Sequence, residues 1–161
     1  MMKQSSFFRY FRKCSESMRR KKILQITPHL GGGVGKAVIG AAMPDKQFNT
    51  EIMLLEKPEK EEIVSRVRDM GINVMACLSD CEVQRKIQET DIVIVNWWNH
   101  PLMSRFLVHF PTVPCRLVLW AHVNGCTYPY LPFDFLNRFD HIFFTTKYSY
   151  ENPFWSMEQC S

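Results

Sequence analysis

A run of glycines separates a short apolar segment from a segment with helical periodicity. The run contains Gly31, Gly32, Gly33 and Gly35 and is followed directly by Lys36. Glycines let backbone N–H groups approach a ligand closely, and a helix N-terminus adds unsatisfied donors and a partial positive charge. The junction therefore suits a phosphate or a sugar hydroxyl. A glycine-rich turn also connects a strand to a helix without any ligand, and this second interpretation stays open.

The spacing of the run argues against two nucleotide-binding motifs. A dinucleotide fingerprint needs a third glycine where the two registers of this run have Lys36 or Val38. A P-loop needs Ser or Thr after its Gly-Lys pair, where Ala37 stands. Glu56 lies where a ribose-binding acid would follow the second strand, so a nicotinamide-dependent oxidoreductase stays an alternative.

Two further clusters carry groups that could bind or react. Trp97 and Trp98 follow one apolar segment and offer flat surfaces for stacking on a sugar ring, although one of the two is expected in the core because neighbours in an extended segment face opposite ways. His122 ends another apolar segment, where an imidazole can act as a base, orient a hydroxyl or satisfy a backbone group. Asn96 and Asn99 can donate to and accept from hydroxyls, although Asn99 can also simply cap the next helix.

Strand-like and helix-like periods alternate along the chain from residue 22. Strands are expected at 22–27, 50–55, 72–76, 91–95, 116–122 and 141–145, with helices or helical turns between them. This alternation predicts an α/β fold with a doubly wound, mostly parallel, Rossmann-like sheet. In the common strand order the first, fourth and fifth strands are neighbours, so the glycine run, the tryptophan pair and His122 should converge at the carboxyl edge of the sheet.

Length and charge place limits on the class of protein. The 161 residues amount to one domain, and an apolar fraction of 46% with 22% charged residues is typical of a water-soluble globular protein. Residues 1–22 carry a net charge of +7 and the remainder −3, so the basic character belongs to a tail and no nucleic-acid partner is expected.

The tail, residues 1–21, mixes its cations with four aromatic residues: Phe7, Phe8, Tyr10 and Phe11. This composition favours either weak contact with an anionic membrane surface or a disordered leader. Arg9 and Arg12 interrupt the aromatic residues, so the tail lacks the apolar core of a signal peptide. No later apolar run reaches membrane-spanning length. We therefore expect a cytoplasmic protein, with peripheral contact at the inner membrane face as an open alternative.

The six cysteines fit neither a paired zinc-ligand spacing nor a small disulfide scaffold, which predicts reduced thiols and no metal. Cys77 and Cys81, with three residues between them, are only a weak suggestion of metal binding.

Taken together, these segments resemble the N-terminal, acceptor-side half of GT-B-fold retaining glycosyltransferases of the glycogen-synthase-like kind (glycosyl transferases group 1). The resemblance covers residues 22–155 and consists of spaced short motifs. They are the segment 23–27 with the glycine run, and the segments 91–97, 119–125 and 140–148.

The resemblance implies a single Rossmann-like half that helps to move a sugar from a nucleotide sugar to a hydroxyl acceptor, such as a polysaccharide, a lipid-linked glycan or a protein glycan. It implies no metal or other cofactor. His122 would line the reaction centre as the catalytic candidate, and the glycine run with Lys36 would bind the donor diphosphate. Candidates for acceptor binding are Trp97, Asn99, Asn124, Thr146, Lys147 and Tyr148.

The chain also departs from that family. Such enzymes close a second domain over the first, and that domain supplies most nucleotide-sugar contacts, including an acidic pair without a counterpart here. Residues 156–161 are therefore expected to begin the interdomain connection, and transfer is expected to require a donor domain in trans. The family usually has a histidine-rich ending to the fourth strand, where this chain has the segment 97–100. The alternative function is a non-catalytic Rossmann-like module that binds a carbohydrate or a protein partner.

Overall fold

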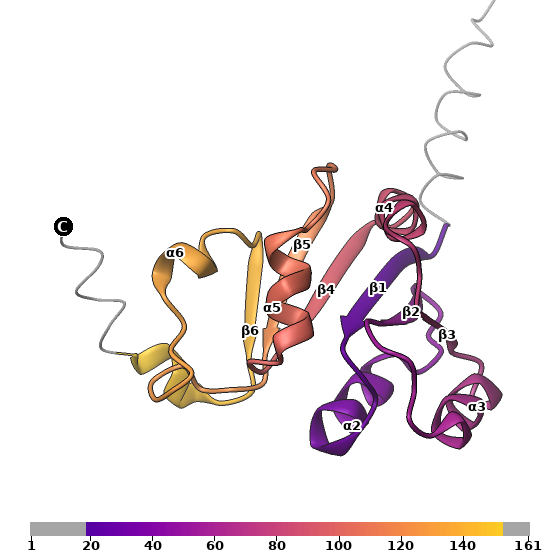
Figure 1. Cartoon of the computed structure of the whole chain (residues 1–161), viewed down its shortest axis with the longest axis horizontal. Coiled ribbons are helices and arrows are strands. Elements are labelled where there is room, and N and C mark those ends of the chain that lie inside the picture. Colours follow the sequence, from indigo (N-terminus) through magenta and orange to yellow (C-terminus); the bar gives the residue numbers. More distant parts are fainter. Residues whose placement is uncertain (1–18, 153–161) are drawn as a thin grey trace, which may run out of the picture.

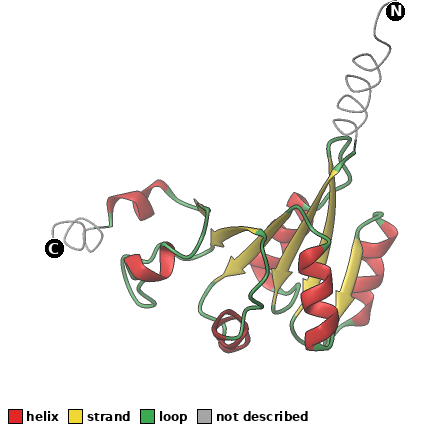
Figure 2. Cartoon of the chain, turned by 90° about the horizontal axis from the view of Figure 1, so that it is seen from above, coloured by secondary structure: helices red, strands yellow, loops and turns green. Residues whose placement is uncertain are grey.

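The computed structural model describes residues 19–152 and shows a six-stranded, all-parallel sheet flanked by helices (Figure 1 and Figure 2). The strands are β1 (Lys21–Thr27), β2 (Phe48–Leu54), β3 (Asn73–Ala76), β4 (Ile92–Trp97), β5 (Arg116–Ala121) and β6 (His141–Phe144). The helices are α2 (Gly32–Ala41), α3 (Glu61–Asp69), α4 (Asp80–Gln88), α5 (Pro101–Val108) and α6 (Phe133–Leu136), with a 3-10 turn η1 (Lys147–Glu151). The strand order, β3-β2-β1-β4-β5-β6, confirms the predicted doubly wound, Rossmann-like fold.

Two apolar clusters, one on each face of the sheet, hold the helices in place. On one face, Val38 of α2 and Val64 and Val67 of α3 pack with strand residues such as Ile52. The other face joins α4 and α5 to the sheet through a cluster that includes Ile87, Met103, Leu107, Val93, Val95 and Leu119. Because side chains alternate along a strand, the residues of β4 on the opposite face from Val93 and Val95 point toward the α2 side.

Charged residues at the helix ends agree with the direction of the helix dipole. Helix α3 has Glu61 and Glu62 in its first turn and two arginines in its last turn. Helix α4 begins with a capping box in which Ser79 and Glu82 satisfy each other's backbone N–H groups. Local sequence thus accounts for where these two helices begin.

Asp91 joins β1 to β4 at their amino ends. Its carboxylate accepts the Lys22 backbone N–H at 2.8 Å and a bond from the Arg19 guanidinium at 2.8 Å. The hydrogen bond from Lys22, followed by the charge of Arg19, lowers the pKa of Asp91 below its usual value. Strand β1 thus starts at Lys21, and the Arg19 side chain adds an ion pair to this junction.

The aromatic part of the tail and the expected interdomain connection at 156–161 lie outside the described residues, and membrane contact by the tail stays a prediction. Within residues 19–152, none of the helices combines the length and the apolar character needed to cross a bilayer.

Helix α2 begins inside the glycine run and not after it, where the sequence analysis placed the helical segment. Gly31 is its N-cap residue, and Gly32 has a φ of +66°, a conformation that favours glycine. Gly35 lies against the backbone of Leu30, so that a Cβ at this position would overlap the Leu30 carbonyl group. Part of the run is therefore explained by packing alone.

We expect Gly35→Ala to lower the free energy of unfolding by about 1–3 kcal/mol, because the added methyl group forces the Leu30 backbone to move. Gly40→Ala in the same helix is the matched control. A Cβ there meets nothing within 4 Å, so this change should be neutral or raise stability by about 0.5–1 kcal/mol. Urea denaturation of both variants measures the difference, and equal effects would show that Gly35 is not a packing glycine.

Candidate functional site

Four aromatic rings gather where β1, β4 and β5 end. His29 follows β1, Trp98 and His100 follow β4, and His122 follows β5. Their ring centroids lie 5.6 Å apart for His29 and Trp98, 5.6 Å for His29 and His100, and 6.3 Å for Trp98 and His122. We call these four residues the carboxyl-edge cluster. The predicted convergence at this edge is therefore present.

Backbone pairing that continues past the strand ends explains the convergence. The His122 N–H donates to the Trp97 carbonyl at 2.9 Å, which places β5 and β4 side by side at this point. The Glu56 N–H donates to the Pro28 carbonyl at 3.3 Å, which places the end of β2 next to the loop that carries His29.

A buried chain of hydrogen bonds lies beneath His122. Gln25 donates to the Val38 carbonyl of α2 at 3.4 Å, and Asn96 donates to the Gln25 side-chain oxygen and to the Ile26 carbonyl, both at 3.2 Å. Gln25 and Asn96 are 1% and 0% exposed, so none of these bonds competes with water. His122 Nε2 lies 3.0 Å from Asn96 Oδ1.

This chain determines which nitrogen of His122 carries the proton. The Asn96 amide nitrogen already faces two oxygens, so its carbonyl oxygen is the group that faces the imidazole. His122 must therefore donate from Nε2–H, which leaves Nδ1 as an acceptor in the neutral ring. Burial lowers the pKa of His122 from 6.5 to about 4. At neutral pH the ring stays unprotonated, so it can accept a hydrogen bond from a hydroxyl but brings no positive charge to a diphosphate.

His29 and His100 are held by backbone groups of their own loops. His29 Nδ1 accepts the Gly31 N–H at 3.0 Å, and His100 Nδ1 accepts the Leu102 N–H at 3.3 Å as the N-cap of α5. The prediction that Asn99 caps this helix is therefore wrong. Asn99 is exposed with a φ of +67° and forms the turn before the cap.

The two histidines share a pocket of about 470 Å³ with Glu56. One ring nitrogen from each and one Glu56 carboxylate oxygen lie within 4.8 Å of one another. Gly31 and Gly32 form part of the same wall, and Glu59 and Lys60 also line the pocket. Imidazole and carboxylate are metal-ligand types, so this is a group in the described residues that could hold a cation.

The glycine run contributes only in part to this pocket. Gly31 and Gly32 line it, whereas Gly33 is exposed in the first turn of α2 and Gly35 is buried against Leu30. Lys36 is exposed and is not among the residues that line the pocket, so the structure does not bring this cation to the predicted diphosphate site.

Trp98 belongs to the carboxyl-edge cluster, whereas Trp97 belongs to the core. The sequence analysis had named Trp97 as a candidate for acceptor binding. Trp97 is 7% exposed and contacts Phe135 on the α4/α5 side, with centroids 5.7 Å apart. Alternation along the strand predicted that one ring would be buried, and the choice between the two followed from the face of β4 on which its last residue, Trp97, lies.

The remaining acceptor candidates lie away from the pocket. Asn124 accepts the Cys126 N–H at 2.9 Å and so stabilises its own turn. Thr146, Lys147 and Tyr148 are exposed beyond β6, where Thr146 contacts Ser149 at 3.4 Å. None of these four residues lines the pocket that contains Glu56.

Sequence reasoning did not assign His29 or Gln25 to the site. It placed His100 only in the segment 97–100 that was expected at this edge, and it considered Asn96 as a group for ligand hydroxyls and not as the buried partner of Gln25 and His122. The available indication was the presence of an amide residue in each of two strands that are otherwise apolar. Asn96 and His122 also lie on the same face of the sheet. The β4–β5 register pairs Asn96 with Trp120, and His122 lies two residues after Trp120 along the same strand direction.

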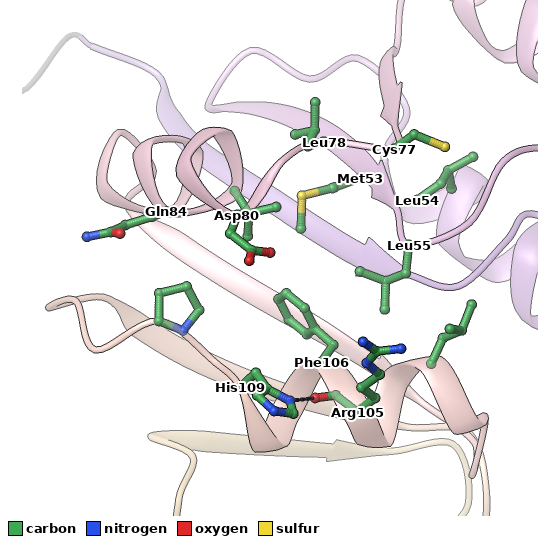
Figure 3. Close-up of a pocket in the computed structure, with 13 residues that line it drawn as sticks. Met53, Leu54, Leu55, Cys77, Leu78, Asp80, Gln84, Arg105, Phe106 and His109 are labelled. Atoms are coloured by element: carbon green, nitrogen blue, oxygen red, sulfur yellow. Dashed lines mark hydrogen bonds between the residues drawn. The ribbon is translucent and has the colours of Figure 1, made fainter.

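A second pocket, of about 530 Å³, opens between α4 and α5 on the opposite face of the sheet (Figure 3). Met53, Leu55 and Phe106 provide apolar walls. Arg105 and His109 line it from α5, where His109 Nδ1 lies 2.9 Å from the Arg105 carbonyl oxygen. None of the site residues predicted from the sequence lines this pocket.

We expect the free energy of unfolding to fall as the pH drops from about 6.5 to about 4, because unfolded His122 takes up a proton that the folded ring refuses. His122→Ala should lower stability at pH 7 by about 1–3 kcal/mol, since it leaves the Asn96 oxygen without its donor. The variant should nevertheless show a flatter pH dependence than the wild type in this range. Urea denaturation at several pH values provides the comparison, and identical slopes would contradict the buried neutral histidine.

We also expect ¹⁵N NMR at pH 7 to show His122 protonated at Nε2 and unprotonated at Nδ1. In the Asn96→Asp variant we expect the pKa of His122 to be higher than in the wild type, because a carboxylate then faces Nε2. A wild-type ring protonated at Nδ1 would be inconsistent with the hydrogen-bond chain.

No family model matches this chain, and comparisons with curated proteins and with solved structures likewise return no match. Its function is therefore argued from the carboxyl-edge cluster and the pocket beside it.

Proposed function

We propose that this domain is the acceptor-side half of a GT-B-type glycosyltransferase and that the carboxyl-edge cluster binds a sugar. The observation that carries the proposal is the position of Trp98, a partly exposed ring with three imidazoles around it. A sugar ring presents apolar C–H faces and polar hydroxyl edges. A tryptophan face bordered by hydrogen-bonding groups complements both features.

The charges near the cluster favour a neutral ligand over a diphosphate. The pocket is lined by two carboxylates, Glu56 and Glu59, and by one cation, Lys60. The neutral state of His122 adds no compensating charge. Any contact with a donor diphosphate would therefore rest on backbone N–H groups at the start of α2, with the Gly31 N–H already used by His29.

In this proposal His122 faces the reacting sugar with Nδ1 as an acceptor for a hydroxyl. The ring is held by its bond to Asn96 and by contact with Trp120, whose centroid lies 4.7 Å away. A fixed acceptor can orient a hydroxyl for transfer. Stabilisation of the departing diphosphate would come from a donor domain in trans, so the chain alone is expected to bind without turnover.

The cluster also supports a second candidate, a non-catalytic carbohydrate-binding module. Stacking on Trp98 and hydrogen bonding to His122 require no second domain. The two candidates share the site and differ in whether transfer follows when a donor domain is supplied.

We expect Trp98→Ala to weaken sugar binding at least tenfold while the fold is retained, because the stacking surface is removed. ¹⁵N NMR titration with methyl α-D-glucopyranoside and with UDP-glucose measures the affinity and locates it through the Trp98 indole and the His122 ring. Phe48→Ala is the control, since Phe48 is an aromatic residue, 38% exposed, at the amino end of β2.

Shifts that spare Trp98 and His122, or equal affinities of the Trp98→Ala variant and the wild type, would refute sugar binding at this edge. Turnover of a nucleotide sugar by the chain alone would refute the half-enzyme interpretation. Binding that never leads to transfer, even with a glycosyltransferase donor domain added, would favour the module.

A further inference from the structure

The pocket of His29, Glu56 and His100 has a hydrogen-bonding pattern that restricts what it can hold. Each histidine uses Nδ1 to accept a backbone N–H, from Gly31 in one case and Leu102 in the other. A neutral imidazole has one donor and one acceptor nitrogen, so the proton of each ring sits on Nε2. Two N–H donors and one carboxylate acceptor are therefore available in the pocket.

This proton arrangement argues against a metal ion, although the residue types would suit one. A histidine that binds a metal through Nε2 ordinarily donates its Nδ1–H to an acceptor. Here the groups facing both Nδ1 atoms are donors. Metal binding through Nε2 would require imidazolate rings or the loss of both backbone hydrogen bonds, one of which caps α5.

Hydroxyl groups complement the pocket. A hydroxyl oxygen accepts one hydrogen bond and its proton is donated to another acceptor, so a hydroxyl can accept from a histidine Nε2–H and donate to Glu56 at the same time. One ring nitrogen of each histidine and one Glu56 carboxylate oxygen lie within 4.8 Å of one another, a separation that one bridging oxygen can span. Each histidine offers one N–H donor and the carboxylate can accept from two hydroxyls, so the three residues can bind two hydroxyls together.

We propose that His29, Glu56 and His100 form a subsite for a vicinal diol, in which the two hydroxyls donate to Glu56 and each accepts from one histidine. The inference rests on the proposed function and specifies which part of the sugar this pocket takes. Both histidines also contact Trp98, with centroids 5.6 and 5.9 Å away. A ring stacked on Trp98 could therefore present its hydroxyl edge to the subsite.

Matched probes with and without the diol test the subsite and separate its two sources. Methyl α-D-glucopyranoside is compared with its 3-deoxy analogue, which retains hydroxyls but no vicinal pair, and UDP is compared with 2′-deoxy-UDP. We expect at least a tenfold preference for the diol in one pair, since a site built for a hydroxyl leaves polar groups unpaired when the hydroxyl is missing. The pair that shows the preference identifies a pyranose or a ribose as the source.

Glu56→Gln should remove this preference, because an amide can accept only through one oxygen and places a donor where the second hydroxyl donates. Glu59→Gln is the control, since Glu59 lines the same pocket outside the three-residue group. The ¹⁵N spectra of both variants report whether the fold is intact.

The outcomes are distinguishable. If a probe shifts Trp98 and His122 but neither deoxygenation nor Glu56→Gln changes its affinity, the diol subsite is wrong and the proposed function stands. If no probe shifts Trp98, the proposed function fails and the subsite fails with it. Zinc chloride is titrated as a separate probe, and tight one-to-one binding that Glu56→Gln abolishes would replace the diol with a metal site.

Discussion

The hydrogen-bond chain from Val38 through Gln25 and Asn96 to His122 connects the parts of the structure that matter for the site. It joins α2 to three adjacent strands, and its two amide residues are buried. Because a buried amide is costly unless its donors and acceptors are matched, the chain requires β1, β4 and β5 to lie in one register with α2 above them. The start of α2 and the position of His122 are thereby fixed relative to each other.

This constraint explains the chemical character of the carboxyl edge. Burial keeps His122 neutral, and its bond to Asn96 leaves Nδ1 as an acceptor. Backbone N–H groups occupy Nδ1 of His29 and of His100, which leaves Nε2 of each ring as a donor in the pocket that Glu56 also lines. The edge therefore combines donors, acceptors and a tryptophan surface with little positive charge. That combination favours hydroxyl groups over phosphates, and it is the reason the proposed ligand is a sugar and not a nucleotide phosphate.

Much of the fold could be predicted because its causes are local. The β-branched run from residue 92 to 95 supports the strand expected at 91–95, and β4 covers Ile92–Trp97. Helix α3 carries its own local signals, with acidic residues in its first turn and Gly71 shortly after its end. The glycine run was harder to interpret, because the sequence does not show that Gly31 caps the helix or that Gly35 packs against the Leu30 backbone.

The sequence by itself determined the alternation of six strands with helices and thereby the parallel, doubly wound class, since periodicity and turn residues act over short stretches. The convergence at the carboxyl edge was predicted only for the common strand order, which the structure has. Only the tertiary structure decided which tryptophan reaches the site, why Lys36 does not, and which nitrogen of each histidine is free. The reason is that these properties depend on partners distant in the chain. Gln25 and Asn96 are 71 positions apart, and no local pattern records that they share a hydrogen bond.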